Sequence, residues 1–153
     1  MLIYHFGSRD GLLSAVVEEV ERRQAERLRE LSDSGSPEQV IMAMHRDLAS
    51  PGLDPLERLF FELYGRALQG DPSVRHLIDP GVRTWLEALT GLYERFGFDR
   101  REARAEATLA LATARGLLLD RLATGEARRV DAAARRYAAS VVQRLGERAR
   151  APS

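Results

Sequence analysis

The 153-residue sequence contains no cysteine and no lysine, and all 23 of its basic residues are arginine. Without cysteine, the chain can form neither a disulfide framework nor a thiolate metal site. The arginine-only composition indicates the codon bias of a GC-rich bacterial genome. Acidic residues also number 23, so the net charge is zero and provides no overall attraction to nucleic acid.

Long uncharged apolar runs and catalytic motifs are missing as well. The best apolar run, residues 109–119, is interrupted by Arg115 and is not suited to span a membrane. The sequence begins without a signal-peptide pattern, so we expect a cytoplasmic protein with no membrane partner. There is no His-Glu-x-x-His zinc pair and no glycine-rich phosphate loop, and the three histidines fall on different predicted helices. We therefore expect neither an enzyme nor a bound metal or cofactor.

Hydrophobic residues make up 44% of the chain, enough for a core, and they recur at helical spacing. No alternating apolar run bounded by hairpin turns is present, so the sequence predicts an all-α fold. Helix starts are marked by Ser36-Pro37-Glu38-Gln39, which forms a capping-box pattern, and by Asp99. Gly125 marks the end of the helix that Asp99 starts. The expected helices cover about residues 9–31, 37–49, 55–69, 72–78, 80–96 and 100–124, and a last helix is capped by Asp131.

The first of these helices, residues 9–31, changes character along its length. Its second half, residues 18–30, is dense in charge and has few apolar residues. A helix of this kind is either largely solvated or connects two bodies of a protein.

The last two helices are rich in small and apolar residues on more than one side, which requires more than one packing partner. We expect them to form a helical pair, and two such pairs, one per subunit, to make a four-helix homodimer interface. The alternative is that these stripes are all buried within one subunit. The candidate interface residues are Leu109, Ala112, Gly116, Leu119, Tyr137, Val141 and Leu145.

The segment from Tyr4 to Leu13, Tyr-His-Phe-Gly-Ser-Arg-Asp-Gly-Leu-Leu, has the pattern of a corner between two helices. Gly7 suits the left-handed end of one helix, and Ser8 can cap the next. The segment resembles the junction between the recognition helix and the ligand domain in the TetR family of bacterial ligand-responsive repressors. The rest of the chain is similar to that family in helix order and length.

The resemblance implies an all-α, TetR-like ligand-binding and dimerisation bundle. Residues 1–7 would be the remnant of the helix-turn-helix recognition helix, and residues 8–150 the effector-binding and dimerisation domain. Tyr4, His5 and Arg9 match positions that commonly contact DNA phosphates in the family. Without a DNA role, His5 would be a surface histidine, Tyr4 a core aromatic and Arg9 an ordinary first-turn residue.

The helix-turn-helix scaffold of the family needs two helices before Leu2, where this sequence has only Met1. Either the sequence starts too late, or the chain has lost DNA binding. We therefore expect a DNA operator as a partner only when the full N-terminal domain is present.

The resemblance also implies a pocket among the middle helices for a small apolar or amphipathic effector. Each candidate residue could instead be plain core, since pockets are themselves mainly apolar. The sequence thus predicts the effector-binding and dimerisation body of a TetR-like regulator, and the alternative is an all-helical interaction module that dimerises without touching DNA. The candidate ligand-binding residues are Met44, His45, Phe61, Tyr64, Trp85 and Tyr93.

Overall fold

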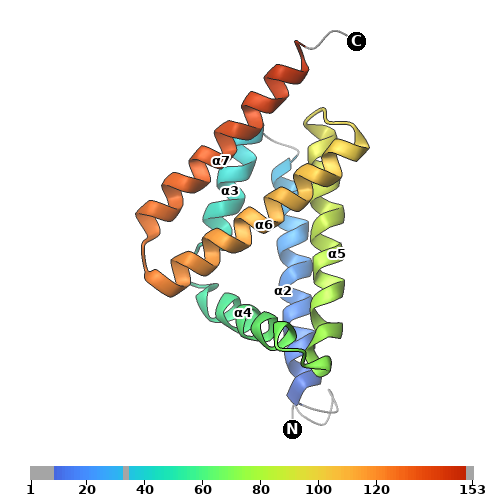
Figure 1. Cartoon of the computed structure of the whole chain (residues 1–153), viewed down its shortest axis with the longest axis vertical. Helices are drawn as coiled ribbons and strands as arrows, with labels where there is room; N and C mark the ends of the chain where they lie inside the picture. The colour runs from blue at the N-terminus through green and yellow to red at the C-terminus, as the bar shows by residue number, and fades with distance from the viewer. Residues whose placement is uncertain (1–8, 33–34, 151–153) are drawn as a thin grey trace.

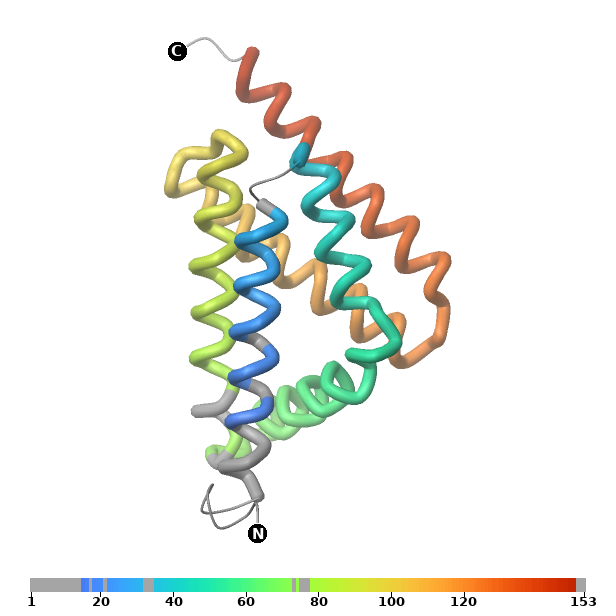
Figure 2. The backbone as a smooth tube through the Cα atoms, turned by 180° about the vertical axis from the view of Figure 1, so that it is seen from behind, coloured from blue at the N-terminus to red at the C-terminus, as the bar shows by residue number. Residues whose placement is uncertain are grey.

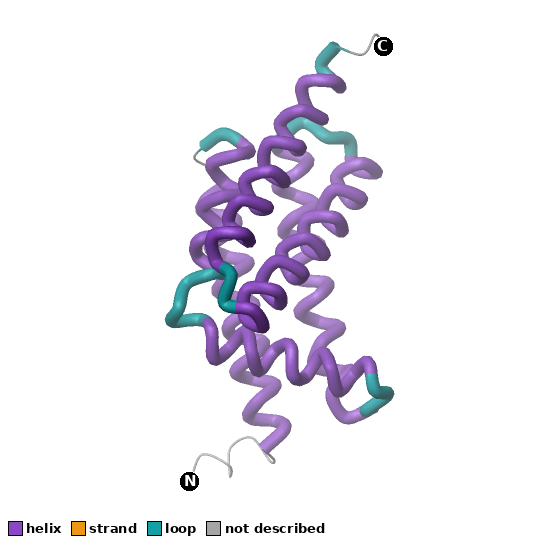
Figure 3. The backbone as a smooth tube through the Cα atoms, turned by 60° about the vertical axis from the view of Figure 1, so that its left-hand side comes forward, coloured by secondary structure: helices purple, strands orange, loops and turns teal. Residues whose placement is uncertain are grey.

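A computed structural model describes residues 9–32 and 35–150 of the chain. Helices and loops account for all of this described part, which contains no strand (Figure 3). None of the described helices is long and apolar enough to cross a lipid bilayer. The helices are α2 (Arg9–Ser32), α3 (Pro37–Leu48), α4 (Asp54–Leu68), α5 (Pro72–Arg95), α6 (Arg100–Thr124) and α7 (Ala127–Arg148).

The two long helices α2 and α5 lie side by side along the long axis of the molecule (Figures 1 and 2). Helix α6 packs diagonally across α5, and α7 packs against both α3 and α6 (Figure 1). Helix α4 lies across the end of the molecule at which α2 begins (Figure 2). The six described helices therefore surround a common interior.

Short-range sequence patterns correctly predicted several helix ends. Ser36 and Gln39 form the reciprocal capping box at the start of α3. The Asp99 side chain accepts hydrogen bonds from two backbone N–H groups in the first turn of α6. Gly125 ends α6 in the left-handed region with φ of 75°. These ends depend on contacts between residues close in sequence, which explains why the sequence alone predicted them.

The predicted break before Pro80 is wrong, because α5 is one continuous helix with Pro80 inside it. A proline within a helix removes one backbone hydrogen bond and costs about 3 kcal/mol. Val74 and Ile78 precede the proline, and both are buried on the same helix that buries Trp85 after it. Burying a large aliphatic side chain stabilises by about 1.5–3 kcal/mol, so these two residues offset the cost of the proline.

The predicted cap at Asp131 is also wrong, because α7 begins four residues earlier, at Ala127. Val130, in the first turn, is only 1% exposed and anchors this early start. The Asp131 carboxylate does not cap the helix but pairs with His45 of α3, with 2.8 Å between His45 Nε2 and Asp131 Oδ1. A contact between residues so far apart in sequence is not visible in the local pattern.

The main core lies where α2, α3, α5, α6 and α7 meet, and a smaller cluster around Leu63 and Val74 joins α4 to α5. An ion pair also holds α6 and α7 together: both guanidinium nitrogens of Arg144 that face Glu106 lie 2.7 Å from its carboxylate oxygens. The most completely buried large side chains of the main core are Leu28, Val40, Leu92, Tyr93 and Val141.

Candidate functional site

A cavity of about 130 Å³ lies in the interior, and all six described helices contribute to its wall. One water needs roughly 10–15 Å³, so the cavity is large enough for several water-sized groups. Most of the wall is apolar. The main apolar side chains of the wall are Leu28, Met44, Leu48, Trp85, Leu89, Leu92, Leu111 and Leu118.

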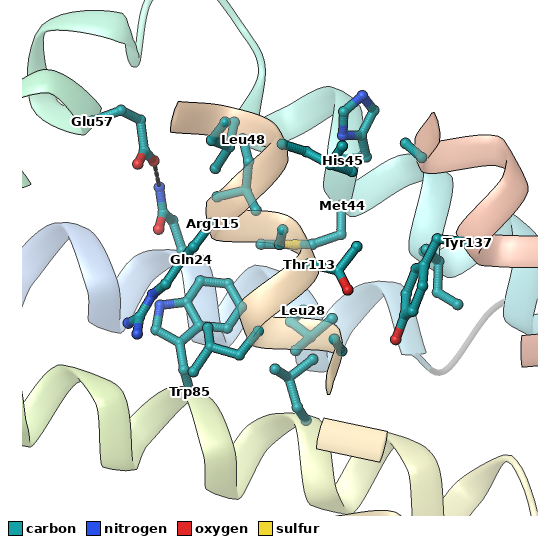
Figure 4. Close-up of a pocket in the computed structure, with 18 of the residues that line it drawn as sticks. Gln24, Leu28, Met44, His45, Leu48, Glu57, Trp85, Thr113, Arg115 and Tyr137 are labelled. Carbon is teal, nitrogen blue, oxygen red and sulfur yellow. Dashed lines mark hydrogen bonds between the residues drawn. The ribbon is translucent and has the colours of Figure 1, made fainter. Parts of the chain in front are cut away.

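Three polar side chains line the wall of the cavity at one end: Gln24 of α2, Glu57 of α4 and Arg115 of α6 (Figure 4). Gln24 Nε2 donates a long hydrogen bond of 3.4 Å to Glu57 Oε1. Burial raises the pKa of the Glu57 carboxyl above its usual range, against the opposing effects of the Gln24 hydrogen bond and of Arg115. This end of the cavity thus contains a cation, a carboxyl group and an amide.

Arg115 is held in place by two aromatic rings of α4. Its Cζ lies 5.1 Å from the centroid of the Phe60 ring and 5.3 Å from that of Tyr64. Its Nη1 also donates a 3.4 Å hydrogen bond to the Tyr64 hydroxyl. Stacking on ring faces restricts the guanidinium while leaving most of its N–H donors available.

Tyr93 of α5 and Tyr137 of α7 line another part of the wall and bond to each other, with 2.9 Å between their hydroxyl oxygens. Burial raises the pKa of both phenols, and that of Tyr93 lies well above its usual range. Both phenols therefore stay neutral at physiological pH and can keep this hydrogen bond. In Figure 4, Tyr137 lies on the opposite side of the pocket from Gln24 and Glu57.

Four of the six predicted ligand-binding residues, Met44, His45, Trp85 and Tyr93, lie in the wall of the cavity. Phe61 and Tyr64 are outside it: Phe61 packs against the main core, and the Tyr64 hydroxyl accepts a hydrogen bond from Arg115. Sequence reasoning assigned Tyr137 to a dimer interface, whereas the structure places it in the cavity wall.

Sequence reasoning also missed the polar residues Gln24, Glu57 and Arg115. A pattern for two of them was present in the sequence. Gln24 falls between Val20 and Leu28 on one stripe of α2, at intervals of four positions. Arg115 interrupts the apolar run of α6. A polar residue on an apolar helix stripe is the pattern expected of a cavity-lining group.

The predicted DNA-contacting residues Tyr4 and His5 lie outside the described residues. Arg9 is the first residue of α2, and its side chain is likewise outside the description. Among the described residues, no group of three His, Asp or Glu side chains is placed to hold a metal ion.

The predicted dimer residues divide into an outer and an inner set. Leu109 and Leu119 are 47% and 49% exposed, and Ala112 and Gly116 are also exposed on the same outer face of α6. Val142 of α7 is a further exposed large apolar residue.

The inner set comprises Tyr137, Val141 and Leu145. Val141 is fully buried in the chain's own core, so it has no surface left for a second subunit. Tyr137 and Leu145 are half-buried and pack against that core. On α7, Val142 rather than Val141 faces outward.

The sequence matches no known family model and no curated protein. Solved structures with a similar fold include two transcriptional regulators. A transcriptional regulator from Rhodococcus sp. Rha1 matches with a TM-score of 0.75 at 20% identity, over 93% of this chain and 77% of that one. A TetR transcriptional regulator from Legionella pneumophila matches with a TM-score of 0.71 at 20% identity, over 91% of this chain and 76% of that one. The chain therefore has the all-α fold of TetR transcriptional regulators.

Proposed function

We propose that this chain is the effector-binding and dimerisation body of a ligand-responsive, DNA-binding transcriptional regulator of the TetR type. The observation that carries the proposal is the largely apolar cavity lined by all six described helices. Small-molecule sites are concave and mainly apolar, with a few polar groups that fix the ligand. The proposal assigns the chain no catalytic role and places its action in the cytoplasm, with DNA.

Helix α2 is the element that would connect the cavity to DNA. Gln24 and Leu28 line the cavity, and the helix begins at Arg9. At about 1.5 Å per residue, Gln24 lies roughly 22 Å along the helix from its start. A ligand that moves this part of α2 would displace the helix start, where the family resemblance puts the DNA-contacting residues Tyr4, His5 and Arg9.

The outer face of α6 supports the homodimer. Leu109, Ala112, Gly116 and Leu119 form a continuous exposed stripe of apolar and small residues. In a two-fold dimer, the same stripe of each subunit meets its copy. Such a dimer would present two DNA-contacting ends about 34 Å apart, one turn of the duplex.

A dimeric interaction module that never touches DNA is the second candidate, because the exposed α6 stripe supports both functions equally. To separate them, the native protein would be captured from its own host and its bound DNA sequenced. Recovery of one recurring duplex sequence, released when a cavity ligand is added, is the result expected for the regulator. A dimer that recovers no preferred sequence would contradict the regulator and favour the module.

A further inference from the structure

Two oppositely charged groups at one end of the cavity do not pair with each other. Within the described residues, neither Glu57 nor Arg115 takes part in an ion pair of 4.0 Å or less. Their hydrogen bonds to the protein, from Gln24 to Glu57 and from Arg115 to Tyr64, are both long, at 3.4 Å. Both side chains nevertheless line the wall of the same cavity.

Other half-buried carboxylates of this chain are paired closely. Asp54, only three residues before Glu57 on α4, lies 2.7 Å from Arg121. Glu106 receives two contacts of 2.7 Å from Arg144. Removing a carboxylate even partly from water without a close partner is costly, so the half-buried Glu57 is an exception that needs a reason.

Most other polar side chains of the wall already have a hydrogen-bond partner. The hydroxyls of Tyr93 and Tyr137 bond to each other, and His45 bonds to Asp131. Thr113 also lines the wall, but its hydroxyl is uncharged, so the charged groups with unused hydrogen-bonding capacity lie at the end formed by Gln24, Glu57 and Arg115. A guanidinium has five N–H donors, and Arg115 uses one of them, in a single long bond.

Building on the proposed function, we propose that the cavity binds an amphipathic ligand with an uncharged head group that both accepts and donates hydrogen bonds, such as a carboxamide. The head carbonyl accepts from Arg115, and the head N–H donates to Glu57. An aliphatic tail lies along the apolar wall formed by Leu28, Met44 and Trp85. Figure 4 shows Glu57, Gln24 and Arg115 grouped on the side where the head would bind.

Charge balance selects the uncharged head. A carboxylate would contact Arg115 but would bring a second negative charge beside Glu57. An ammonium would contact Glu57 but would bring a second positive charge beside Arg115. Like charges in a site of low dielectric repel strongly, whereas a neutral head leaves the existing balance intact. Burial raises the pKa of Glu57, which agrees with a group that is poorly hydrated and lacks a close partner.

The test compares octanamide, octanoate and octylamine, which each have eight carbon atoms and differ in head charge. Trp85 is the only tryptophan of the chain and lies in the wall, so its emission reports on the cavity. The full chain is titrated at about pH 7.5, where octanoate is ionised and octylamine protonated. We expect octanamide to bind with a Kd about tenfold or more below those of the two charged probes.

Two variants make the test sharper. Glu57→Gln removes the negative charge, so it should lower the Kd of octanoate by about tenfold and raise that of octylamine, which loses its carboxylate contact. Arg115→Gln should lower the Kd of octylamine by a similar factor. The matched controls are Glu62→Gln, an exposed carboxylate on the same α4 helix, and Arg100→Gln, an exposed arginine at the start of α6. Circular dichroism confirms that each variant is folded, and if Arg115→Gln is not, the Glu57→Gln arm decides.

Tightest binding by octanoate or octylamine in the unmodified chain would overturn the uncharged head. Equal binding of all three probes would overturn head selection but leave the apolar cavity as a ligand site. No change of Trp85 emission and no heat of binding with any probe would overturn both this inference and the ligand-binding part of the proposed function.

Discussion

Removing the Tyr137 hydroxyl should destabilise the fold more than removing the Tyr93 hydroxyl, although both substitutions break the same 2.9 Å hydrogen bond. Tyr93 is 1% exposed, so in the Tyr137→Phe variant its hydroxyl is left buried without its partner. An unsatisfied buried hydroxyl costs about 1–3 kcal/mol. In the Tyr93→Phe variant the remaining hydroxyl belongs to the half-buried Tyr137 and can reach water more easily, so the loss should be about 0.5–1.5 kcal/mol.

The double variant provides the decisive comparison. Replacing both partners leaves no orphaned hydroxyl, so its cost should be clearly below the sum of the single costs, with a coupling energy of about 1 kcal/mol. Urea denaturation followed by circular dichroism measures the three free energies of unfolding. All samples need the same protein concentration, because dimerisation would add to the apparent stability. Equal losses in the two single variants, or strictly additive losses in the double variant, would refute the reasoning.

Three further predictions concern the cavity and the outer face of α6. Glu57→Gln should raise the free energy of unfolding at neutral pH, because burial raises the pKa of the folded carboxyl and so disfavours its ionised form. In urea titrations, this gain should shrink as the pH falls toward 4.5, the ordinary pKa of a glutamate. A gain that grows as the pH falls would contradict the assignment. Leu119→Glu should raise the dissociation constant of the dimer, measured by sedimentation, at least about tenfold. The control Leu68→Glu, at a 76% exposed residue of α4, should leave that constant unchanged. Equal effects of the two substitutions would argue against the α6 interface. Gly116→Ala should stabilise the dissociated monomer by about 1 kcal/mol, since a Cβ there meets no atom within 4 Å. A loss of stability in urea titrations of the dilute protein would contradict this expectation.

The sequence predicted correctly those features that depend on contacts between residues close in sequence, and it failed where the contacts are between distant residues. Caps such as Ser36 with Gln39, and the glycine end at Gly125, depend on neighbours in sequence, and the structure confirms them. The continuity of α5 through Pro80 depends on burial against other helices, which a local pattern cannot show. The same holds for Asp131, whose partner His45 is 86 residues away.

The sequence predicted part of the candidate cavity's wall but not its polar end at Gln24, Glu57 and Arg115. Met44 and Trp85 were singled out as mixed or aromatic residues on apolar stripes, and both line the wall. Glu57 has no such mark, because a glutamate in the first turn of a helix is also explained by the helix dipole. Only the three-dimensional structure shows that Glu57 of α4 lies next to Gln24 of α2.

Helix α6 is the element through which the proposed ligand and the proposed dimer would influence each other. Its inner side brings Leu111, Arg115 and Leu118 to the cavity, and its outer side exposes Leu109 and Leu119. A ligand held by Arg115 would therefore act on the same rigid body that carries the dimer stripe, with no intervening loop. Couplings between sites are typically about 1–3 kcal/mol, and they are reciprocal. Under the proposed function, a cavity ligand that changes the dimer constant must have its own affinity changed by dimerisation to the same extent, so measuring both constants with octanamide would test this coupling through α6.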